Sequence, residues 1–418
     1  MVSRARARVV RLTAVPRPLT PWSTLAVLAL LPLAACQTAN GSSVSDAESP
    51  SASVSPASTS SAPPAPEVQV STNLGARTRT VPVSTVLSVH ADGGTLRDVV
   101  VRGGGVRLAG DLSADGTAWE ATGRLEPGLD YAVNAVTVRT DGVVRRTHSA
   151  FHTQDLTLDQ QTYASVSPLQ GETVGVGMPV IVNFDVPVRD KATFEQHMTV
   201  TSTPRQRGSW YWMSDYEAHW RPVRYWRAGT EVSVDIDVNS LPAGGGVFGQ
   251  ESRHVDFHVG DAVISKVNAQ THQMQTYING VLARTTPITT GKPGFTTRSG
   301  VKVIIEKFRV KRMNSETVGI AADDPEAYDI DDVEYAMRVT YSGEFLHAAP
   351  WSVGSQGYAN VSHGCTGMST DNAAWIYNIS KRGDVVEYTG TDVYMSLTNG
   401  YGDWNLSFPE YTKGSALR

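Results

Sequence analysis

The sequence is poor in cysteine, in excess charge and in long apolar runs, and each shortage excludes a class of protein. Only two of its 418 residues are cysteine, Cys36 and Cys365, so the chain is no disulfide-rich scaffold. The formal net charge is only −5, which leaves no basic excess for binding nucleic acid. The longest apolar run falls short of the ~20 residues that a membrane-spanning helix needs. With 40% hydrophobic and 18% charged residues, the chain is instead typical of foldable globular domains, about two to four at this length.

The first 66 residues are expected to target and tether the protein. Residues 1–36 combine a basic start, a short apolar stretch and Leu33-Ala34-Ala35-Cys36, which resembles the lipobox of a bacterial lipoprotein signal peptide. Cys36 would then carry the lipid anchor; an ordinary signal peptide cut near Ala35, or a membrane helix, are the alternatives. Residues 37–66 are mainly Ser, Ala and Pro, which cannot bury enough apolar surface to fold, so we predict a disordered linker.

Residues 67–154 and 155–260 each read as a small β-sandwich of the immunoglobulin-like type. Apolar residues alternate from Val81 to Val89, as in a half-buried strand, and Asp141-Gly142 separates two strand-like runs, as in a hairpin. The second segment is rich in tryptophan. A sugar-stacking platform is one interpretation, but the pattern favours core or domain-interface packing for Trp210, Trp212, Trp220 and Trp226.

The third domain, residues 261–388, is predicted to be β-rich with one short helix. Asn279-Gly280 indicates a tight turn between two strands, and residues 370–380 have apolar side chains at helical spacing. A strand over 383–388 closes the domain, and residues 389–418 form a tail.

Cys365 lies in the stretch Ser362-His363-Gly364-Cys365 and has no evident disulfide partner. A thiolate is a strong nucleophile, and a nearby imidazole, that of His363 or His347, can generate it. A glycine beside the nucleophile lets backbone N–H groups turn toward a developing oxyanion. We therefore expect an exposed, imidazole-activated thiol; the alternative is a small buried side chain beside a hydrogen-bonded histidine.

The flanks of this stretch carry a family resemblance. Phe345-Leu346-His347-Ala348-Ala349-Pro350-Trp351-Ser352, then Asn372-Ala373-Ala374-Trp375 and the Lys381–Glu387 run, resemble the active-site signature of L,D-transpeptidases with a YkuD-type catalytic domain. The multidomain actinobacterial enzymes are the most similar group. The resemblance covers residues 155–418 well and 67–154 loosely. It implies that the tail packs back on the preceding domains.

The resemblance also implies a role for each site residue. Cys365 would be the nucleophile and His347 the general base, with His363 supporting the thiolate or substrate, and the amides of Gly364 and Cys365 forming the oxyanion hole. The substrate groove would be lined by Met313, Tyr328, Ser342, Gly343, Trp351, Ser362 and Gly367.

Three departures from the family pattern bear on that site. Ala348 replaces a serine that several relatives have after the histidine; this is harmless if a backbone carbonyl orients the imidazole, and otherwise Ser362 or water must do so. Thr366-Gly367 follows the cysteine, and Val318 stands where some relatives have a lid tyrosine. Residues 306–335 would form the lid. Its acidic run could bind a cation, but a solvated loop is favoured, and no metal or organic cofactor is expected.

Taken together, these features predict an enzyme that builds 3→3 crosslinks in peptidoglycan through a cysteinyl thioester. The donor would be a tetrapeptide stem, D-Ala the leaving group and the amine of a second stem the acceptor. An L,D-carboxypeptidase, and a catalytically degenerate wall-binding lipoprotein, are the alternatives. The predicted partners are stem peptides and, through the lipid, the membrane. We expect a monomer on the outer face of the cell membrane that acts in the wall.

Overall fold

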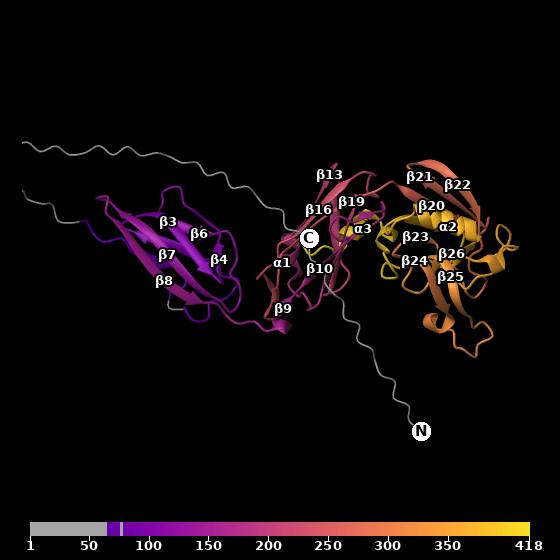
Figure 1. Cartoon of the computed structure of the whole chain (residues 1–418), viewed down its shortest axis with the longest axis horizontal. Helices are drawn as coiled ribbons and strands as arrows, with labels where there is room; N and C mark the ends of the chain where they lie inside the picture. Colours follow the sequence, from indigo (N-terminus) through magenta and orange to yellow (C-terminus); the bar gives the residue numbers. More distant parts are fainter. Residues whose placement is uncertain (1–64, 76–77) are drawn as a thin grey trace, which may run out of the picture. The chain divides into compact units, whose positions relative to one another are not determined.

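The computed structural model describes residues 65–75 and 78–418, which are mainly β-structure, as predicted (Figure 1). The predicted signal peptide, its Cys36 and nearly all of the predicted linker lie outside the described residues. Within the described part, none of the helices has the length and apolar character needed to cross a membrane.

Residues 69–152 form two four-stranded sheets, in the orders β1-β2-β6-β5 and β4-β3-β7-β8, around a core that includes Leu87, Val101, Leu125 and Trp119. β7 and β8 pair antiparallel around Asp141-Gly142, with Val138 opposite Val144, which confirms the predicted hairpin. The strands are Gln69–Thr72 (β1), Ser88–Asp92 (β2), Gly94–Gly103 (β3), Val106–Leu108 (β4), Gly110–Leu112 (β5), Ala118–Ala121 (β6), Asp130–Arg139 (β7) and Val144–His152 (β8).

The strand predicted over Val81–Val89 is wrong for most of its length, because β2 begins only at Ser88. Val81, Val83 and Leu87 are buried, so the alternation correctly reports which side chains enter the core. The backbone between them turns instead of pairing, since the N–H of Thr85 donates to the carbonyl oxygen of Pro82 at 3.0 Å. Alternating burial therefore does not require a ladder of inter-strand hydrogen bonds.

Residues 164–259 form a second pair of sheets, in the orders β10-β12-β15-β14 and β11-β19-β16-β13, beside a small sheet, β17-β18-β9. All four tryptophans of this segment are buried in its core, which confirms the packing interpretation. The elements are Leu158–Gln160 (η1), Gln161–Thr162 (β9), Ala164–Ser167 (β10), Thr173–Val174 (β11), Val180–Phe184 (β12), Lys191–Gln196 (α1), Met198–Thr203 (β13), Gly208–Trp212 (β14), Glu217–Pro222 (β15), Glu231–Ile236 (β16), Pro242–Gly244 (β17), Val247–Gly249 (β18) and Arg253–Val259 (β19).

Two further sheets, β22-β21-β20-β28-β23 and β24-β25-β26-β27, build the third domain with helix α2. Apolar side chains of both sheets and of α2 share one core, including Met274, Met337, Leu346 and Ile376. The elements are Val263–Asn268 (β20), Gln273–Ile278 (β21), Val281–Pro287 (β22), Gly300–Val303 (β23), Glu306–Asn314 (β24), Ser315–Val318 (η2), Asp329–Arg338 (β25), Phe345–Ala348 (β26), Pro350–Ser352 (η3), Thr366–Met368 (β27), Thr370–Ile379 (α2) and Val385–Thr389 (β28). The side chain of Ser369 caps α2 by accepting from the N–H of Asn372.

The C-terminal tail, with Asp403–Asn405 (η4), Phe408–Tyr411 (α3) and Thr412–Gly414 (η5), lies against the second sandwich. The indole of Trp404 donates to the carbonyl oxygen of Gly177 at 2.7 Å. Deeper in the contact, buried His219 sits between two carboxylates, those of Asp403 at 3.0 Å and Glu217 at 2.6 Å. Burial alone would lower the pKa of His219, but the two carboxylates outweigh it and raise the pKa to about 9.

We expect His219→Gln to lower the free energy of unfolding by about 3 kcal/mol at pH 6, the linkage value of a pKa raised from 6.5 to about 9. A raised pKa stabilises the fold fully below pH 6.5, and this stabilisation is lost as the pH rises through about 9. The difference between the two proteins should therefore shrink at alkaline pH. Urea unfolding followed by tryptophan fluorescence measures it, and the matched control is His254→Gln, an exposed histidine that also contacts two carboxylates.

Candidate active site

Two neighbouring parallel strands bring the predicted nucleophile and base to one face of a sheet. β26 carries His347, and β27 begins directly after Cys365. The strands pair with His347 opposite Gly367. Because side chains alternate along a strand, Cys365, two residues before Gly367, projects to the same face as His347. Both residues line one cavity of about 270 Å³.

The imidazole of His347 is held in the form that can accept a proton. Its Nδ1 lies 2.7 Å from the carbonyl oxygen of Ala348, which can only accept, so Nδ1 carries the proton and Nε2 the lone pair. Burial lowers the pKa of His347, so the ring is neutral at pH 7. Trp351 stacks on this ring with 5.9 Å between centroids. The orienting group is thus a backbone carbonyl, and alanine at position 348 leaves this contact intact.

Cys365 is more enclosed than the sequence suggested. The residue is half-buried, and burial raises the pKa of its thiol to about 12. The N–H of Phe345 donates to the sulfur and lowers the pKa, but this does not offset the burial. The carbonyl oxygen of Gly343 lies 3.6 Å from Sγ. The thiol is therefore protonated at rest, and a base must remove its proton as the sulfur attacks.

His363, predicted to support the thiolate or substrate, makes its polar contact with the lid. Its Nε2 lies 2.9 Å from Oε2 of Glu326, and Lys292 pairs with the same carboxylate. Lys292, and after it His363, hold the pKa of Glu326 below its usual value. The ring centroid of His363 lies 4.6 Å from that of Phe295 and 5.1 Å from that of Tyr328. His363 therefore connects the nucleophile's loop to the segment between β24 and β25.

The turn before the nucleophile requires glycine at position 364. Gly364 has a φ of +114°, a conformation that side chains rarely adopt. Its N–H donates to Ser362 Oγ at 3.2 Å, and that hydroxyl donates to the carbonyl oxygen of Cys365 at 2.6 Å. Of the two predicted oxyanion donors, the Gly364 amide is thus engaged within the turn and would have to exchange this partner for an oxyanion.

The remaining predicted binding residues gather around the same place. The cavity that holds Cys365 and His347 is also lined by Met313, Tyr328, Trp351, Ser362 and Gly367. Ser342 and Gly343 line an adjoining hollow, together with Val318. Burial raises the pKa of Tyr328 to about 12, so its hydroxyl keeps its proton and can donate.

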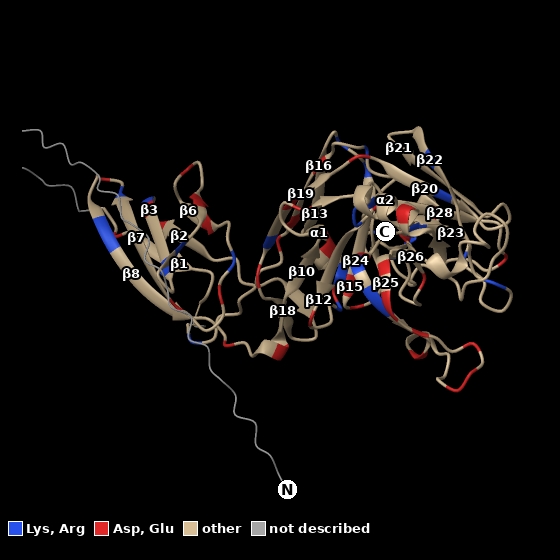
Figure 2. Cartoon of the chain, turned by 45° about the vertical axis from the view of Figure 1, so that its right-hand side comes forward, with Lys and Arg blue, Asp and Glu red and all other residues tan. Residues whose placement is uncertain are grey.

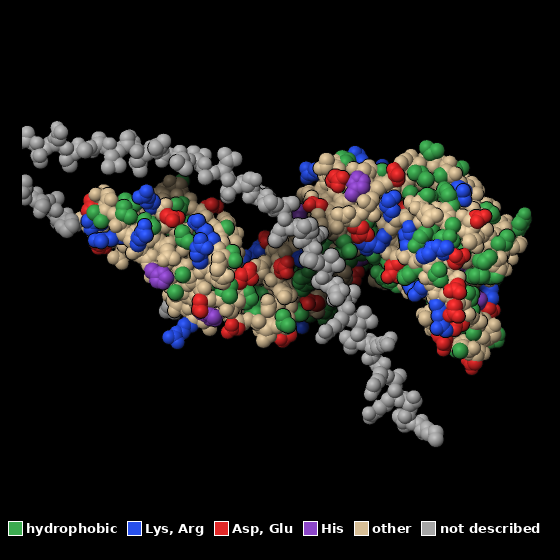
Figure 3. All heavy atoms as spheres, in the orientation of Figure 1, with side chains coloured by type: hydrophobic (Ala, Val, Ile, Leu, Met, Phe, Trp, Pro, Cys, Tyr) green, Lys and Arg blue, Asp and Glu red, His purple; other side chains and the backbone are tan. Residues whose placement is uncertain are grey.

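The lid hairpin of β24 and β25 carries side chains of both signs (Figures 2 and 3). Arg309 pairs with Glu334, and Arg312 pairs with Asp329 and Asp331. In residues 65–75 and 78–418, no group of three or more His, Cys, Asp or Glu side chains is placed to hold a metal ion. Arginines thus balance part of the acidic run.

Sequence reasoning missed a buried ion pair next to the nucleophile. Lys302 on β23 pairs with Glu344, with side chains 0% and 6% exposed, and Arg298 reaches the same carboxylate at 2.9 Å. A signal existed, because Lys302 interrupts an apolar run between Val301 and Val303. A charged residue inside a buried strand needs a partner, although the sequence does not say which one.

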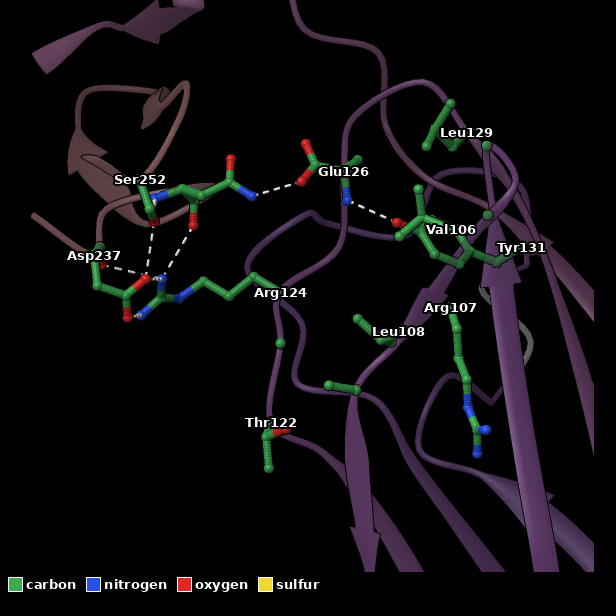
Figure 4. Close-up of a pocket in the computed structure, with 15 residues that line it drawn as sticks. Val106, Arg107, Leu108, Thr122, Arg124, Glu126, Leu129, Tyr131, Asp237 and Ser252 are labelled. Atoms are coloured by element: carbon green, nitrogen blue, oxygen red, sulfur yellow. Dashed lines mark hydrogen bonds and ion pairs between the residues drawn. The ribbon is translucent and has the colours of Figure 1, made fainter. Parts of the chain in front are cut away.

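A larger cavity, of about 530 Å³, lies between the loops of the first and second sandwiches (Figure 4). Arg124 reaches Asp237 across it at 3.2 Å. Among the described residues, those lining this cavity include neither a cysteine nor a histidine. The volume of a cavity does not by itself identify an active site. We place the active site in the smaller cavity, because that cavity holds the thiol and the imidazole.

Comparison with known families agrees with this geometry. The model of the L,D-transpeptidase catalytic domain, YkuD, matches residues 262–387, and that of the bacterial Ig domain, Big_10, matches residues 78–242. The second match confirms the predicted immunoglobulin-like character of the N-terminal part. The cavity with Cys365 and His347 lies within the first match.

Similar proteins cover most of the chain. L,D-transpeptidase 2 of Mycobacterium tuberculosis is 35% identical over 338 residues, 80% of this chain and 82% of that protein. L,D-transpeptidase 5 of the same species is 31% identical over 345 residues, 81% of this chain and 74% of that protein. Among solved structures, an L,D-transpeptidase in complex with imipenem is 38% identical over 55% of this chain and 99% of its own, with a TM-score of 0.49. The chain therefore belongs to the L,D-transpeptidases, acyltransferases with a YkuD-type catalytic domain.

Proposed function

We propose that this L,D-transpeptidase joins peptidoglycan stem peptides by 3→3 crosslinks, with Cys365 as the acylated residue. One observation carries the proposal: a thiol and a neutral imidazole line the same cavity, and the imidazole has its lone pair on Nε2. A nucleophile beside a base that a third group orients is the arrangement that acyl transfer needs.

In the first step, Sγ of Cys365 attacks the carbonyl carbon of the diamino acid at position three of a tetrapeptide stem. Nε2 of His347 accepts the thiol proton as the carbon–sulfur bond forms. The carbon–nitrogen bond to D-Ala then breaks, and the imidazolium returns the proton to the leaving amine. A thioester remains on Cys365.

In the second step, the side-chain amine of another stem attacks the thioester. His347 takes a proton from this amine and returns it to the sulfur as the carbon–sulfur bond breaks. Each tetrahedral intermediate carries an oxyanion that backbone N–H groups near Gly364 and Cys365 stabilise. Two acyl transfers through a thioester divide one difficult exchange into two easier ones.

The remaining groove residues hold the donor stem in this scheme. Trp351 packs on His347 and offers an apolar wall, and Tyr328 presents a hydroxyl from the lid side. Ser342 and Gly343 line the adjoining hollow, along which the rest of an extended peptide would lie. For location, we propose lipid attachment at Cys36, which would place the enzyme outside the cell membrane and within reach of the wall.

The test is incubation of the full chain with a disaccharide-tetrapeptide, followed by mass spectrometry of protein and products. We expect free D-Ala, an adduct on the peptide that contains Cys365, and crosslinked dimers. Tripeptide products without dimers would show that water is the acceptor, which makes the protein an L,D-carboxypeptidase. Wall binding without adduct or product would identify a degenerate enzyme and end the proposal.

A further inference from the structure

We propose that Glu344 is a positioning residue for the nucleophile, because it anchors the backbone segment that contacts the Cys365 sulfur. The inference rests on the proposed function only in taking Cys365 as the nucleophile. It adds a residue that the family resemblance does not assign.

Glu344 lies between the two residues whose backbones contact the sulfur. On one side, the carbonyl oxygen of Gly343 is 3.6 Å from Sγ of Cys365. On the other side, the N–H of Phe345 donates to the same sulfur. Any movement of residue 344 along the chain therefore shifts both groups relative to the thiol.

The side chain of Glu344 is fixed from three directions. Its Oε1 accepts from the guanidinium of Arg298 at 2.9 Å and from the backbone N–H of Arg298 at 3.1 Å. Its Oε2 pairs with the ammonium of Lys302. Lys302 is itself fully buried, and its ammonium lies 3.7 Å from the centre of the Tyr388 ring. The backbone N–H of Glu344 donates to Thr340 Oγ1 at 2.8 Å.

The loop that supplies Arg298 also holds the other side of the nucleophile. The hydroxyl of Thr297 donates to the carbonyl oxygen of Gly364 at 2.8 Å, one residue before Cys365. Glu344 Cγ lies 3.7 Å from the position that a side chain at Gly364 would occupy. The carboxylate of Glu344 thus connects the segment before β26 to the loop of Thr297 and Arg298, and the sulfur lies between these two segments.

A buried ion pair of this kind gives little net stability, since desolvation offsets most of the attraction. Well-packed apolar residues would serve the fold equally well, so its position beside the thiol indicates a role in the site. The two charges of the pair also act on the sulfur in opposite directions: that of Glu344 raises the pKa of the thiol and that of Lys302 lowers it, as does the charge of nearby Arg338.

Charged and titratable groups surround the thiol. They are Lys302 on β23, Tyr328 on the lid side, Arg338 on β25, Glu344 before β26, His347 on β26, His363 in the nucleophile's own loop and Tyr388 on β28; Arg298 joins them through its pair with Glu344. Removing the charge of Glu344 leaves the cations in excess and should favour the thiolate. If Glu344 acted only through its charge, its loss would make the thiol more reactive and would not slow catalysis. If Glu344 positions the sulfur, its loss lowers kcat, so the two roles can be told apart.

The experiment compares full-chain Glu344→Gln, Lys302→Met and the double variant with the parent protein. At pH 8, we expect Glu344→Gln to increase alkylation of Cys365 by iodoacetamide about tenfold and Lys302→Met to decrease it about tenfold, one pKa unit in each direction. Peptide mass spectrometry separates Cys365 from Cys36. In the transpeptidase reaction, Glu344→Gln should nevertheless lower kcat about 10- to 100-fold with little change in KM, because the sulfur is misplaced.

The matched control is Glu251→Gln, an exposed glutamate of the second sandwich that pairs with Arg253, and we expect it to change neither readout. A folded Glu344→Gln protein with parental kcat would overturn the proposal. Should a single variant fail to fold, the double variant decides: reduced kcat supports positioning, and parental kcat rejects it. If the parent chain forms no acyl adduct, the proposed function fails, and the alkylation rates still report the effect of Glu344 on the thiol.

Discussion

Cys365→Ala is expected to abolish acyl-enzyme formation and to lower turnover about 10⁴-fold or more, as removal of a nucleophile does in other enzymes. No other described residue offers a thiol, because Cys365 is the free cysteine of the described chain. The neighbouring hydroxyl of Ser362 cannot take over, since it donates to the carbonyl oxygen of Cys365 at 2.6 Å within the turn. The loss should therefore be in kcat.

Carbapenems give the most direct readout of this prediction. We expect intact mass spectrometry of the parent protein to show one covalent adduct, and peptide mapping to place it on Cys365. Cys36→Ala removes the other thiol of the chain and should keep the adduct, so it is the matched control. Cys365→Ser, which keeps the shape of the side chain but not the sulfur, should lose it. Unchanged turnover in Cys365→Ala would refute the proposed mechanism.

Local patterns predicted much of the fold because their cause is local. The turn at Asp141-Gly142 requires only that these two residues favour a tight turn, and β7 and β8 pair around it. α2 follows from apolar side chains at helical spacing, and the structure adds that Ser369 caps it. The Val81–Val89 strand failed for the complementary reason: hydrophobic alternation predicts burial, whereas pairing depends on neighbours far along the chain.

The sequence likewise identifies single residues of the site but not the contacts between residues that are distant in the chain. Cys365 and His347 could be named from motifs and resemblance, but their shared cavity depends on parallel pairing of β26 and β27, which an intervening 17-residue segment separates in the chain. The ion pair of Lys302 and Glu344 spans 42 positions, and no spacing rule connects them. Whether a carbonyl or a hydroxyl orients the imidazole was likewise open until the 2.7 Å contact with Ala348 settled it.

His347→Gln is expected to lower the rate of acylation about 10²- to 10⁴-fold at pH 7, the range for loss of a general base. The raised thiol pKa makes this base necessary. Burial raises the pKa of the thiol well above pH 7, so the resting thiol keeps its proton and a base must remove it as the sulfur attacks. Glutamine can still occupy the space under Trp351, so the loss reports proton transfer more than packing.

The pH profile distinguishes a lost base from a distorted pocket. Burial lowers the pKa of His347 below the usual 6.5. The rate of the parent protein should therefore rise with pH in the acid range and reach its plateau before pH 6.5, once the imidazole is neutral. His347→Gln should lose this limb and instead rise tenfold per pH unit toward the thiol pKa. His258→Gln, an exposed histidine that pairs with Glu231 in the second sandwich, should keep the parental profile. A His347→Gln protein that retains the acid limb would assign this limb to another group and contradict the role of His347 as the base.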